Sequence, residues 1–595
     1  MKKFRSIIPI IASAFSLAFI SIESNVKAEV VFGSGYAVQQ TKPVASQNRE
    51  TVDVSKFGAK CNDGSDATLA VIEALEYCNK TKAKKLIFPK GSYNFSPDLA
   101  FEKYYSITNN DGSLKRITFP IIGFNNFEID GQGSEFIFTG FICPFIIDRS
   151  TNVTIKNFSI DWKRTFNSEG KVIAVRENEM DVTFSNKYPY SIENNKLIFK
   201  DENKNKLLVG SLLEYDPVKN ETAFKVNDYY CGPNVKVEAK GNGVVTVFLK
   251  GIKAKPGNIM SFQADHRLCP AITLTDSKGI TVNQVNIYHA GGMGVVAQRT
   301  KDILLDKVQV KPAPNSGRMV SLTADATHFS NCSGTVSMFN CVFTNQQDDA
   351  TNIHGIYVRA DRKLAPNKVL VKLVHAQQYG FDYIVKGQKL ELVNNLSLVT
   401  YKVLTVKSVK RINSEYTNVE FLESLPAEFK TGDIFAAMEY PNVVIKNCTM
   451  GGNRARGILL GSRGKILVEG NTFHVPGAAI LMEGDGRFWF EQSGVRNMEI
   501  KNNIFNNCNY GTWGNALIQV GAGIDKSFTG NSRYNRNIVI ENNEIRSFDP
   551  RVLNIYSVDS LTYRNNKVNK STDYPEQNAN AAPFNVKSSS NVKTE

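Results

Sequence analysis

The chain has 595 residues, of which 42% are apolar and 22% are charged. Its 36 phenylalanines and 22 tyrosines exclude a disordered protein, and its length excludes a single small domain, since domains usually have about 100–200 residues. The 71 lysines and arginines exceed the 57 acidic residues and give a net charge of +14. That excess alone would suit nucleic acid, an anionic glycan or an anionic membrane surface as a partner.

The first 28 residues have the pattern of a secretory signal peptide. Basic residues precede an apolar stretch from Ile7 to Ile22, and Val26-Lys27-Ala28 places small residues at the −3 and −1 positions of a cleavage site. The apolar stretch is shorter than the ~20 residues that a membrane span needs. We therefore expect export to the periplasm, the cell surface or the medium of a bacterium, without stable membrane insertion after cleavage. For an exported protein we expect no nucleic-acid partner.

Residues 69–80 have the apolar spacing of an amphipathic helix and lie between two short strand-like segments. The first segment includes Phe57-Gly58-Ala59, and the second runs from Leu86 to Tyr93. This order resembles the start of the pectate-lyase-like superfamily of β-helix proteins, in which a short helix covers the first coil. A cover is needed because the end of a coil stack exposes an apolar cross-section.

A seven-residue pattern of alternating apolar and polar residues then recurs along the chain, and most copies have Asn or Gly at the sixth position. The copies are residues 152–158, 279–285, 302–308, 442–448, 465–471, 497–503, 537–543 and 560–566. Alternation with period two is typical of a half-buried strand. Val282 and Leu305 lie 23 residues apart, as do Ile445 and Val468. A strand that recurs at this period predicts an all-β protein, a right-handed parallel β-helix. Asn suits the corners because it tolerates left-handed backbone and its amide can bond to the next coil.

Two regions interrupt the repeat. Residues 163–260 and 357–440 contain short alternating strands without the corner asparagine, and each predicts a small β-barrel inserted in a loop of the solenoid. Such barrels could hold two copies together as a homodimer. The predicted order is signal peptide 1–28, cap and first coils 29–162, barrel 163–260, coils 261–356, barrel 357–440, coils 441–568 and a frayed polar tail 569–595.

Three aspartates stand out in the coils between the two insertions. Asp325 and Asp349 precede the same Ala-Thr step and lie 24 residues apart, and Asp348 is the neighbour of Asp349. Stacked strands are about 4.7–4.9 Å apart, so we expect Asp325 and Asp349 one above the other. Carboxylates at this distance raise one another's proton affinity. One protonated and one ionised carboxyl group is what glycoside hydrolysis requires.

The residues alone leave several interpretations open. A calcium site or a solvated acidic turn would also gather aspartates. The protein could be a glycosidase, a β-helix polysaccharide lyase that acts on a uronic-acid polymer, or a glycan-binding solenoid without activity. A lyase would combine an acidic calcium site with a basic catalytic residue, and the positive net charge would suit its polymer.

Four further residues are candidates for substrate binding. Arg456 should lie one coil beyond Asp349, where it could bind hydroxyl groups or keep a carboxylate ionised; a surface salt bridge is the alternative. Trp489 could provide a stacking surface for a sugar ring, or could simply pack its loop. Glu483 ends the strand that should lie above Arg456 in the stack. His289 precedes the coil below Asp325 and could instead be a buried structural imidazole.

The segments Ala324-Asp-Ala-Thr-His-Phe329 and Asn345-Gln-Gln-Asp-Asp-Ala-Thr-Asn-Ile-His-Gly355 resemble glycoside hydrolase family 110, bacterial α-1,3-galactosidases that act on blood group B-type glycans. The resemblance covers essentially the whole mature chain. It implies exo-acting, inverting hydrolysis of terminal α-1,3-linked galactose, without metal or cofactor. Members of the family differ in whether they require a branching fucose, and we expect the form that accepts both branched and linear glycans. The resemblance also implies that Asp348 is the general acid, and that Asp325 and Asp349 bind and deprotonate the attacking water.

Overall fold

The computed structural model describes residues 51–232, 235–264 and 266–595. The predicted signal peptide lies outside these ranges. Within them, every helix is too short or too polar to cross a membrane.

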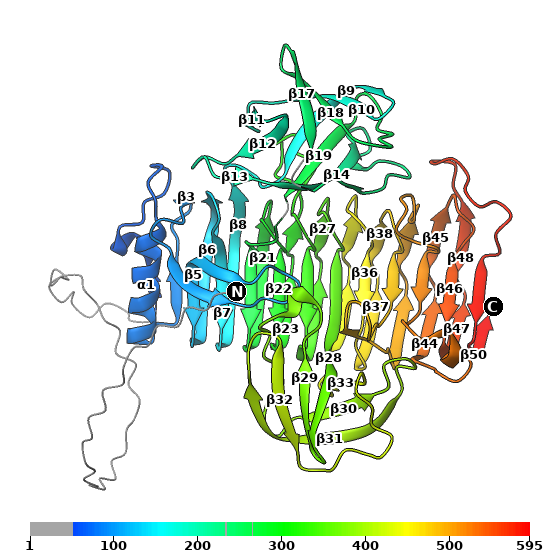
Figure 1. Ribbon diagram of the computed structural model, residues 1–595. Helices are drawn as coiled ribbons and strands as arrows, with labels where there is room; N and C mark the ends of the chain where they lie inside the picture. The colour runs from blue at the N-terminus through cyan, green and yellow to red at the C-terminus, as the bar shows by residue number, and fades with distance from the viewer. Residues whose placement is uncertain (1–50, 233–234, 265) are drawn as a thin grey trace, which may run out of the picture. The chain divides into compact units, whose positions relative to one another are not determined.

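The repeated strands lie side by side in one parallel sheet, drawn as a row of arrows in Figure 1. They are β8 (Thr151–Trp162), β21 (Lys278–Ile287), β23 (Lys301–Asp306), β26 (Ser333–Phe339), β34 (Asn442–Lys446), β37 (Lys465–Glu469), β41 (Asn497–Lys501), β44 (Asn535–Glu541) and β47 (Val558–Arg564). The register stacks matched apolar positions: Val282 pairs with Ile155 on one side and with Leu305 on the other. Ile445 likewise pairs with Val468. The predicted parallel β-helix is therefore confirmed.

A second set of parallel strands forms the wall that carries the predicted site. In order along the stack they are β7 (Cys143–Asp148), β20 (Ile272–Thr275), β22 (Val295–Gln298), β25 (Thr327–Ser330), β28 (Thr351–Ala365), β36 (Ile458–Leu460), β39 (Ile480–Met482), β43 (Ile518–Val520) and β46 (Leu553–Tyr556). Most of their side chains are buried, as expected where one coil covers the next.

Each corner has two adjacent positions with different roles, whereas the sequence analysis assigned both roles to one asparagine. The first adopts left-handed backbone, with φ between 54° and 57° at Asn447, Asn502, Asn542 and Asn565. The second sends its side-chain amide to the next coil. Asn471 donates to Asn503, Asn503 to Asn543 and Asn543 to Asn566, at 2.9, 2.9 and 2.8 Å. This buried ladder fixes the register between successive coils of the C-terminal half.

The helix α1 (Thr68–Thr81) lies at the N-terminal end of the stack, as Figure 1 shows. It buries Val71, Leu75 and Cys78 in the core that the first coils share. The helix predicted over residues 69–80 is thus confirmed. It covers the apolar end of the first coil, as the resemblance to pectate-lyase-like proteins implied.

Both insertions form antiparallel sheets. The first runs from β9 (Ser168–Arg176) to β19 (Ile259–Ala264). The second comprises β29 (Lys368–Lys372), β30 (Lys389–Val393), β31 (Thr400–Arg411), β32 (Tyr416–Phe421) and β33 (Ile434–Ala437), with the far end of β28. Because β28 passes from the coil wall into the second insertion without a break, that domain boundary falls inside a strand.

The predicted frayed tail is wrong. Residues 569–595 contain β49 (Phe584–Lys587) and β50 (Ser590–Thr594), which pair in parallel with β46 and β47 as a further coil. The Phe584 ring packs edge-on against Tyr563 of the preceding coil. The segment is polar because most of its side chains are exposed.

Candidate functional site

The three aspartates lie in the turns that lead into β25 and β28. Thr327 pairs with Thr351, and two residues earlier Asp325 stacks on Asp349, so the predicted stacking is confirmed. The backbone fixes this arrangement, because the Ala326 amide donates to the Asp349 carbonyl oxygen and the Gly294 amide to the Asp325 carbonyl oxygen, each at 3.0 Å.

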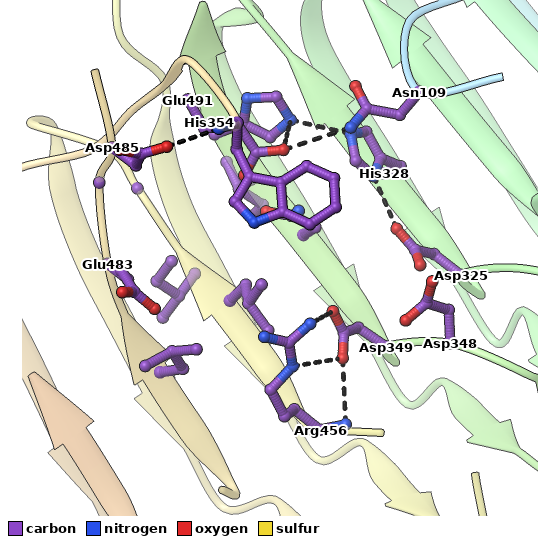
Figure 2. Close-up of a pocket in the computed structure, with 18 of the residues that line it drawn as sticks. Asn109, Asp325, His328, Asp348, Asp349, His354, Arg456, Glu483, Asp485 and Glu491 are labelled. Atoms are coloured by element: carbon purple, nitrogen blue, oxygen red, sulfur yellow. Dashed lines mark hydrogen bonds and ion pairs between the residues drawn. The ribbon is translucent and has the colours of Figure 1, made fainter. Parts of the chain in front are cut away.

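The carboxylate groups face one another. One oxygen from each of Asp325, Asp348 and Asp349 lies within 4.8 Å of the others. Figure 2 shows the three side chains beside one another, with Asp349 directed toward Arg456 and Asp325 toward His328. All three are buried, with 4%, 9% and 3% of their surface exposed. Three carboxylates this close and this buried cannot all be ionised unless cations compensate for them.

Three arginines provide that compensation. Arg267 Nη2 lies 2.6 Å from Asp348 Oδ2, and Arg454 Nη1 lies 2.9 Å from Asp348 Oδ1. Arg456 binds Asp349 with Nε and Nη2, at 3.0 and 2.9 Å, and its backbone amide adds a third bond at 3.0 Å. Arg456 therefore holds the Asp349 carboxylate in place, and its charge favours the ionised form, while the predicted contact with hydroxyl groups stays a prediction.

The first insertion contributes to this site. Arg267 follows its last strand, β19, on the return to the solenoid. Asp228, which belongs to the insertion, binds Arg454 Nε with both carboxylate oxygens at 2.8 and 3.0 Å. Arg454 thus bridges Asp228 and Asp348, and the insertion fixes the charge next to Asp348.

The surroundings separate the proton affinities of the three aspartates. Burial, reinforced by the charge of Asp348, raises the pKa of Asp325 to about 8. Burial also raises the pKa of Asp349 to about 7, although Arg456 acts in the opposite direction. For Asp348, burial is outweighed by Arg454 and Arg267, which lower its pKa. The expected splitting into protonated and ionised carboxyl groups is therefore built into the site.

Two histidines extend the cluster. His328 Nδ1 lies 2.7 Å from Asp325 Oδ2, and His328 Nε2 lies 2.9 Å from His354 Nε2. Glu491 Oε1 lies 3.6 Å from His354 Nε2 and accepts a hydrogen bond from Asn109 Nδ2 at 3.2 Å. Figure 2 shows this chain above the aspartates.

The aspartates open into a pocket of about 370 Å³. Arg456, Glu483 and Trp489 all line it, together with Arg267 and Phe488. This volume is within the ~300–1,000 Å³ that is usual for small-molecule sites. The structure thus brings three of the four predicted binding residues to the same pocket as the aspartates.

Glu483 and Trp489 occupy different parts of the pocket wall. Glu483 directly follows β39, the strand that stacks on β36. Burial raises its pKa against the effect of Arg456. Trp489 is half exposed, at 49%. Its backbone amide donates to Asp485 at 2.5 Å, and Gln378 of the second insertion donates to its carbonyl oxygen at 3.1 Å. The second insertion therefore supports the aromatic part of the pocket.

His289 does not reach the pocket, which corrects the prediction that it binds substrate. Its ring is fully buried and stacks on Phe166. Nε2 accepts from the Phe166 amide at 2.9 Å, and Nδ1 lies 2.6 Å from the Ser321 carbonyl oxygen. Ala290 pairs with Leu322, so His289 is level with Ser321 and four residues ahead of Asp325. It is the buried structural imidazole of the alternative interpretation.

Several residues of the pocket and of the charge cluster beside it were not predicted. His328 stands within the motif around Asp325, and Arg454 lies two residues before Arg456, so both were within reach of the coil alignment. Arg267 and Glu491 follow irregular segments of variable length, so the coil repeat does not predict where their side chains lie. Asn109 comes from a loop far earlier in the chain and meets the site only through the fold.

The cluster is a poor match for a calcium site. Both oxygens of Asp348 and both oxygens of Asp349 already accept hydrogen bonds from arginine side chains. A cation would have to bind beside three guanidinium groups, against their repulsion. The donor set fits a group of carboxylates that exchange protons better than it fits a metal centre.

Comparison with known proteins supplies the family. Residues 168–260 match the model for GLAA-B beta-barrel domain I, residues 368–435 that for GLAA-B beta-barrel domain II, and residues 434–594 that for a right handed beta helix region. These matches agree with the predicted right-handed β-helix that carries two inserted barrels.

Curated relatives match nearly the full chain. Alpha-1,3-galactosidase A of Shewanella woodyi is 36% identical over 553 residues, which cover 91% of this chain and 89% of the relative. Alpha-1,3-galactosidase A of Bacteroides fragilis is 29% identical over 91% of this chain and 90% of its own. Alpha-1,3-galactosidase B of Bacteroides thetaiotaomicron is 28% identical over 88% and 86%. The chain is therefore a glycosidase that belongs to the bacterial α-1,3-galactosidase family, as the two aspartate motifs indicated.

Proposed function

We propose that the protein is an exo-acting, inverting glycoside hydrolase that removes terminal α-1,3-linked galactose from blood group B-type glycans and from linear α-1,3-galactosyl glycans. The observation that carries the proposal is the set of three buried aspartates, with oxygens within 4.8 Å of one another, that line a pocket of about 370 Å³. Split proton affinities within one such group provide both an acid and a base.

The pocket supports action at a chain end. Its volume suits one or two sugar rings better than a long polymer. Trp489 and Phe488 offer exposed aromatic faces at its wall, and such faces contact the apolar side of sugar rings. Glu483 and Arg456 supply polar groups that can bind hydroxyl groups.

Within the proposal, Asp348 protonates the leaving oxygen, while Asp325 and Asp349 hold the attacking water between them. A general acid must carry a proton, but Arg454 and Arg267 lower the pKa of Asp348. The assignment therefore requires that this effect be weakened when substrate binds. Arg267 lines the pocket and Arg454 does not. The leaving group therefore has to displace Arg267 from Asp348 Oδ2, after which burial favours the protonated acid.

Leaving-group chemistry tests this role. Asp348→Asn should be far less impaired on an aryl α-galactoside whose phenol departs without protonation than on a disaccharide. Asp349→Asn should be impaired on both, because it lacks the base. Equal impairment of Asp348→Asn on the two substrates would mean that Asp348 is not the acid.

The stereochemical outcome is a separate part of the proposal. Acid and base of inverting glycosidases are usually roughly 6.5–9.5 Å apart, and roughly 5–5.5 Å separates the two groups of retaining enzymes. The nearest oxygens here are within 4.8 Å, so this spacing does not itself argue for inversion. Inversion requires that the water held by Asp325 and Asp349 attack directly. Proton NMR should then find β-galactose as the first product, and α-galactose would contradict it.

Substrate choice is tested by comparing linear galactosyl-α-1,3-galactose with the fucosylated B trisaccharide. We expect release of galactose from both. A β-linked galactobiose is the control and should remain intact. Release from neither α-1,3-linked sugar would refute the proposed activity, and release from the trisaccharide alone would show that the branching fucose is required.

The same proposal places the enzyme outside the cytoplasm, in the periplasm or secreted, as the signal-peptide pattern of residues 1–28 indicates. Mass spectrometry of the protein from its native host should find a mature chain that begins near residue 29.

A homodimer held by the inserted barrels would appear in sedimentation as twice the mass of the chain.

A further inference from the structure

Asp325 is the first member of a buried chain of hydrogen bonds that ends at a backbone carbonyl group. Its Oδ2 lies 2.7 Å from His328 Nδ1, and His328 Nε2 lies 2.9 Å from His354 Nε2. His354 Nδ1 in turn lies 2.9 Å from the carbonyl oxygen of Gly355. The first two contacts are the dashed lines from Asp325 toward His354 in Figure 2.

If both imidazole rings are neutral, each hydrogen bond in this series can have only one donor and one acceptor. A carbonyl oxygen can only accept, so His354 Nδ1 carries the proton and His354 Nε2 presents a lone pair. His328 must therefore donate from Nε2, which leaves a lone pair on its Nδ1. That lone pair faces Asp325 Oδ2 at hydrogen-bond distance, and the contact is favourable only if the oxygen carries a proton.

Burial supports neutral rings and a protonated Asp325. It lowers the pKa of His328 to about 4 and also lowers the pKa of His354. It raises the pKa of Asp325 to about 8. The surrounding charges oppose one another: Glu491, Asp348 and Asp349 raise the pKa of His328, and Arg267 lowers it.

Resting on the proposed function, we propose that His328 is a positioning residue that keeps Asp325 protonated, so that Asp349 alone takes the proton of the attacking water. Asp325 then gives its Oδ2 proton to the bond with His328 and uses Oδ1 to orient the water. The water oxygen bonds to the anomeric carbon as the glycosidic bond breaks, Asp349 receives the water proton, and Asp348 protonates the leaving oxygen. No further reactant is needed.

The positions of the protons on His328 and His354 can be measured without substrate. The sequence contains 6 histidines, so isotope labelling of the imidazole nitrogens gives few NMR signals, which single substitutions can assign. From about pH 5 to about pH 8, we expect His328 to carry its proton on Nε2 and His354 on Nδ1. A proton on His328 Nδ1, in either the charged ring or the other tautomer, would overturn the inference. This result stays readable even if the galactosidase activity fails.

Two substitutions test the consequence for catalysis. The amide of Asp325→Asn can donate to His328 and accept from water, as a protonated Asp325 would, whereas Asp349→Asn has no base. Asp325→Asn should therefore retain a kcat at least about 100-fold above that of Asp349→Asn, since a general base contributes roughly 10²–10⁴-fold. Equal kcat values for the two variants would overturn the assignment of the base.

Replacement of His328 gives a readout that a purely structural role would not produce. His328→Phe removes the acceptor, so Asp325 ionises at lower pH and its charge raises the pKa of Asp349. The acid limb of the kcat/KM profile should move up by about one pH unit. His328→Asn places an oxygen near the Nδ1 position and should reverse part of this shift. A uniform loss of kcat/KM without a shift would contradict the proposal.

Discussion

Arg456 and Asp349 face each other across adjacent coils, and the guanidinium group binds both oxygens of the carboxylate at 3.0 and 2.9 Å. The register of β28 and β36 produces this pairing, because Thr351 pairs with Ile458 and the two residues therefore occupy the same position of successive coils. The coil stack thus places the proposed base, Asp349, and the cation that influences its charge side by side.

Arg456→Lys should shift the pH dependence of the enzyme. Burial raises the pKa of Asp349 to about 7 while Arg456 acts to lower it, so loss of the two-point contact should raise that pKa further. The base then ionises at higher pH, and the acid limb of kcat/KM should move upward by about one unit. The measurement is kcat/KM against pH. A downward shift would mean that Arg456 does not stabilise the ionised base.

Asp325→Asn should stabilise the fold more in alkaline solution than in acid. Asp325 has a pKa of about 8 in the folded protein against 3.8 for the unconstrained group, so the folded state binds more protons between these values. Its contribution to stability is then fully present below about 3.8 and falls as the pH rises through 8. Thermal unfolding should give a variant whose Tm advantage over the wild type grows from pH 5 to about pH 8.5. An advantage that is constant with pH would contradict the raised pKa.

Asn503→Ala should destabilise the C-terminal coils. Asn503 is buried, accepts from the backbone and the side chain of Asn471, and donates to Asn543 and to the Val468 carbonyl oxygen. Each buried group left without a partner costs about 1–3 kcal/mol, so we expect a loss of at least about 3 kcal/mol in urea unfolding. Asn502→Gly is the matched control, because the position has left-handed backbone, which glycine adopts readily, and the change removes only an exposed 3.5 Å contact with Glu469. Equal stability of both variants would show that the ladder contributes little.

Trp489→Ala should weaken substrate binding and spare the chemical step. The ring lines the pocket but does not contact the aspartates, whose partners are arginines and His328. Loss of one aromatic contact should raise KM about 10-fold with a nearly unchanged kcat. Tyr104→Ala removes a similarly exposed aromatic side chain outside this pocket and serves as the control. A fall in kcat with unchanged KM would place Trp489 in the chemistry instead.

Residues could be placed from the sequence only where the coils repeat at a regular spacing. Asp325 and Asp349 were placed on each other because no insertion separates their coils, and Arg456 because the second insertion returns to the same register. Asp228 belongs to an irregular segment of the first insertion, and Arg267 to the irregular return from that insertion to the solenoid. No repeat carries positional information in either segment. The contacts of the two residues with Asp348 and Arg454 depend on tertiary packing alone.

The two wrong predictions have physical causes of the same kind. His289 lies on the same stack as the aspartates but four residues ahead of them, and its side chain turns into the core beside Phe166. Residues 569–595 have the polar composition of a tail, yet their backbone continues the parallel pairing of the previous coil. Composition describes exposure, whereas in a solenoid the backbone of the neighbouring coil determines whether a strand forms.

The most direct test of the account is the release of galactose from galactosyl-α-1,3-galactose by the wild type and by Asp348→Asn. Asp98→Asn, which changes an exposed aspartate outside the pocket, is the matched control. The account predicts that the wild type and the control release galactose at equal rates, and that Asp348→Asn is slower by about 10²–10⁴-fold while its unfolding curve stays cooperative. Turnover by Asp348→Asn near the wild-type rate would contradict the account.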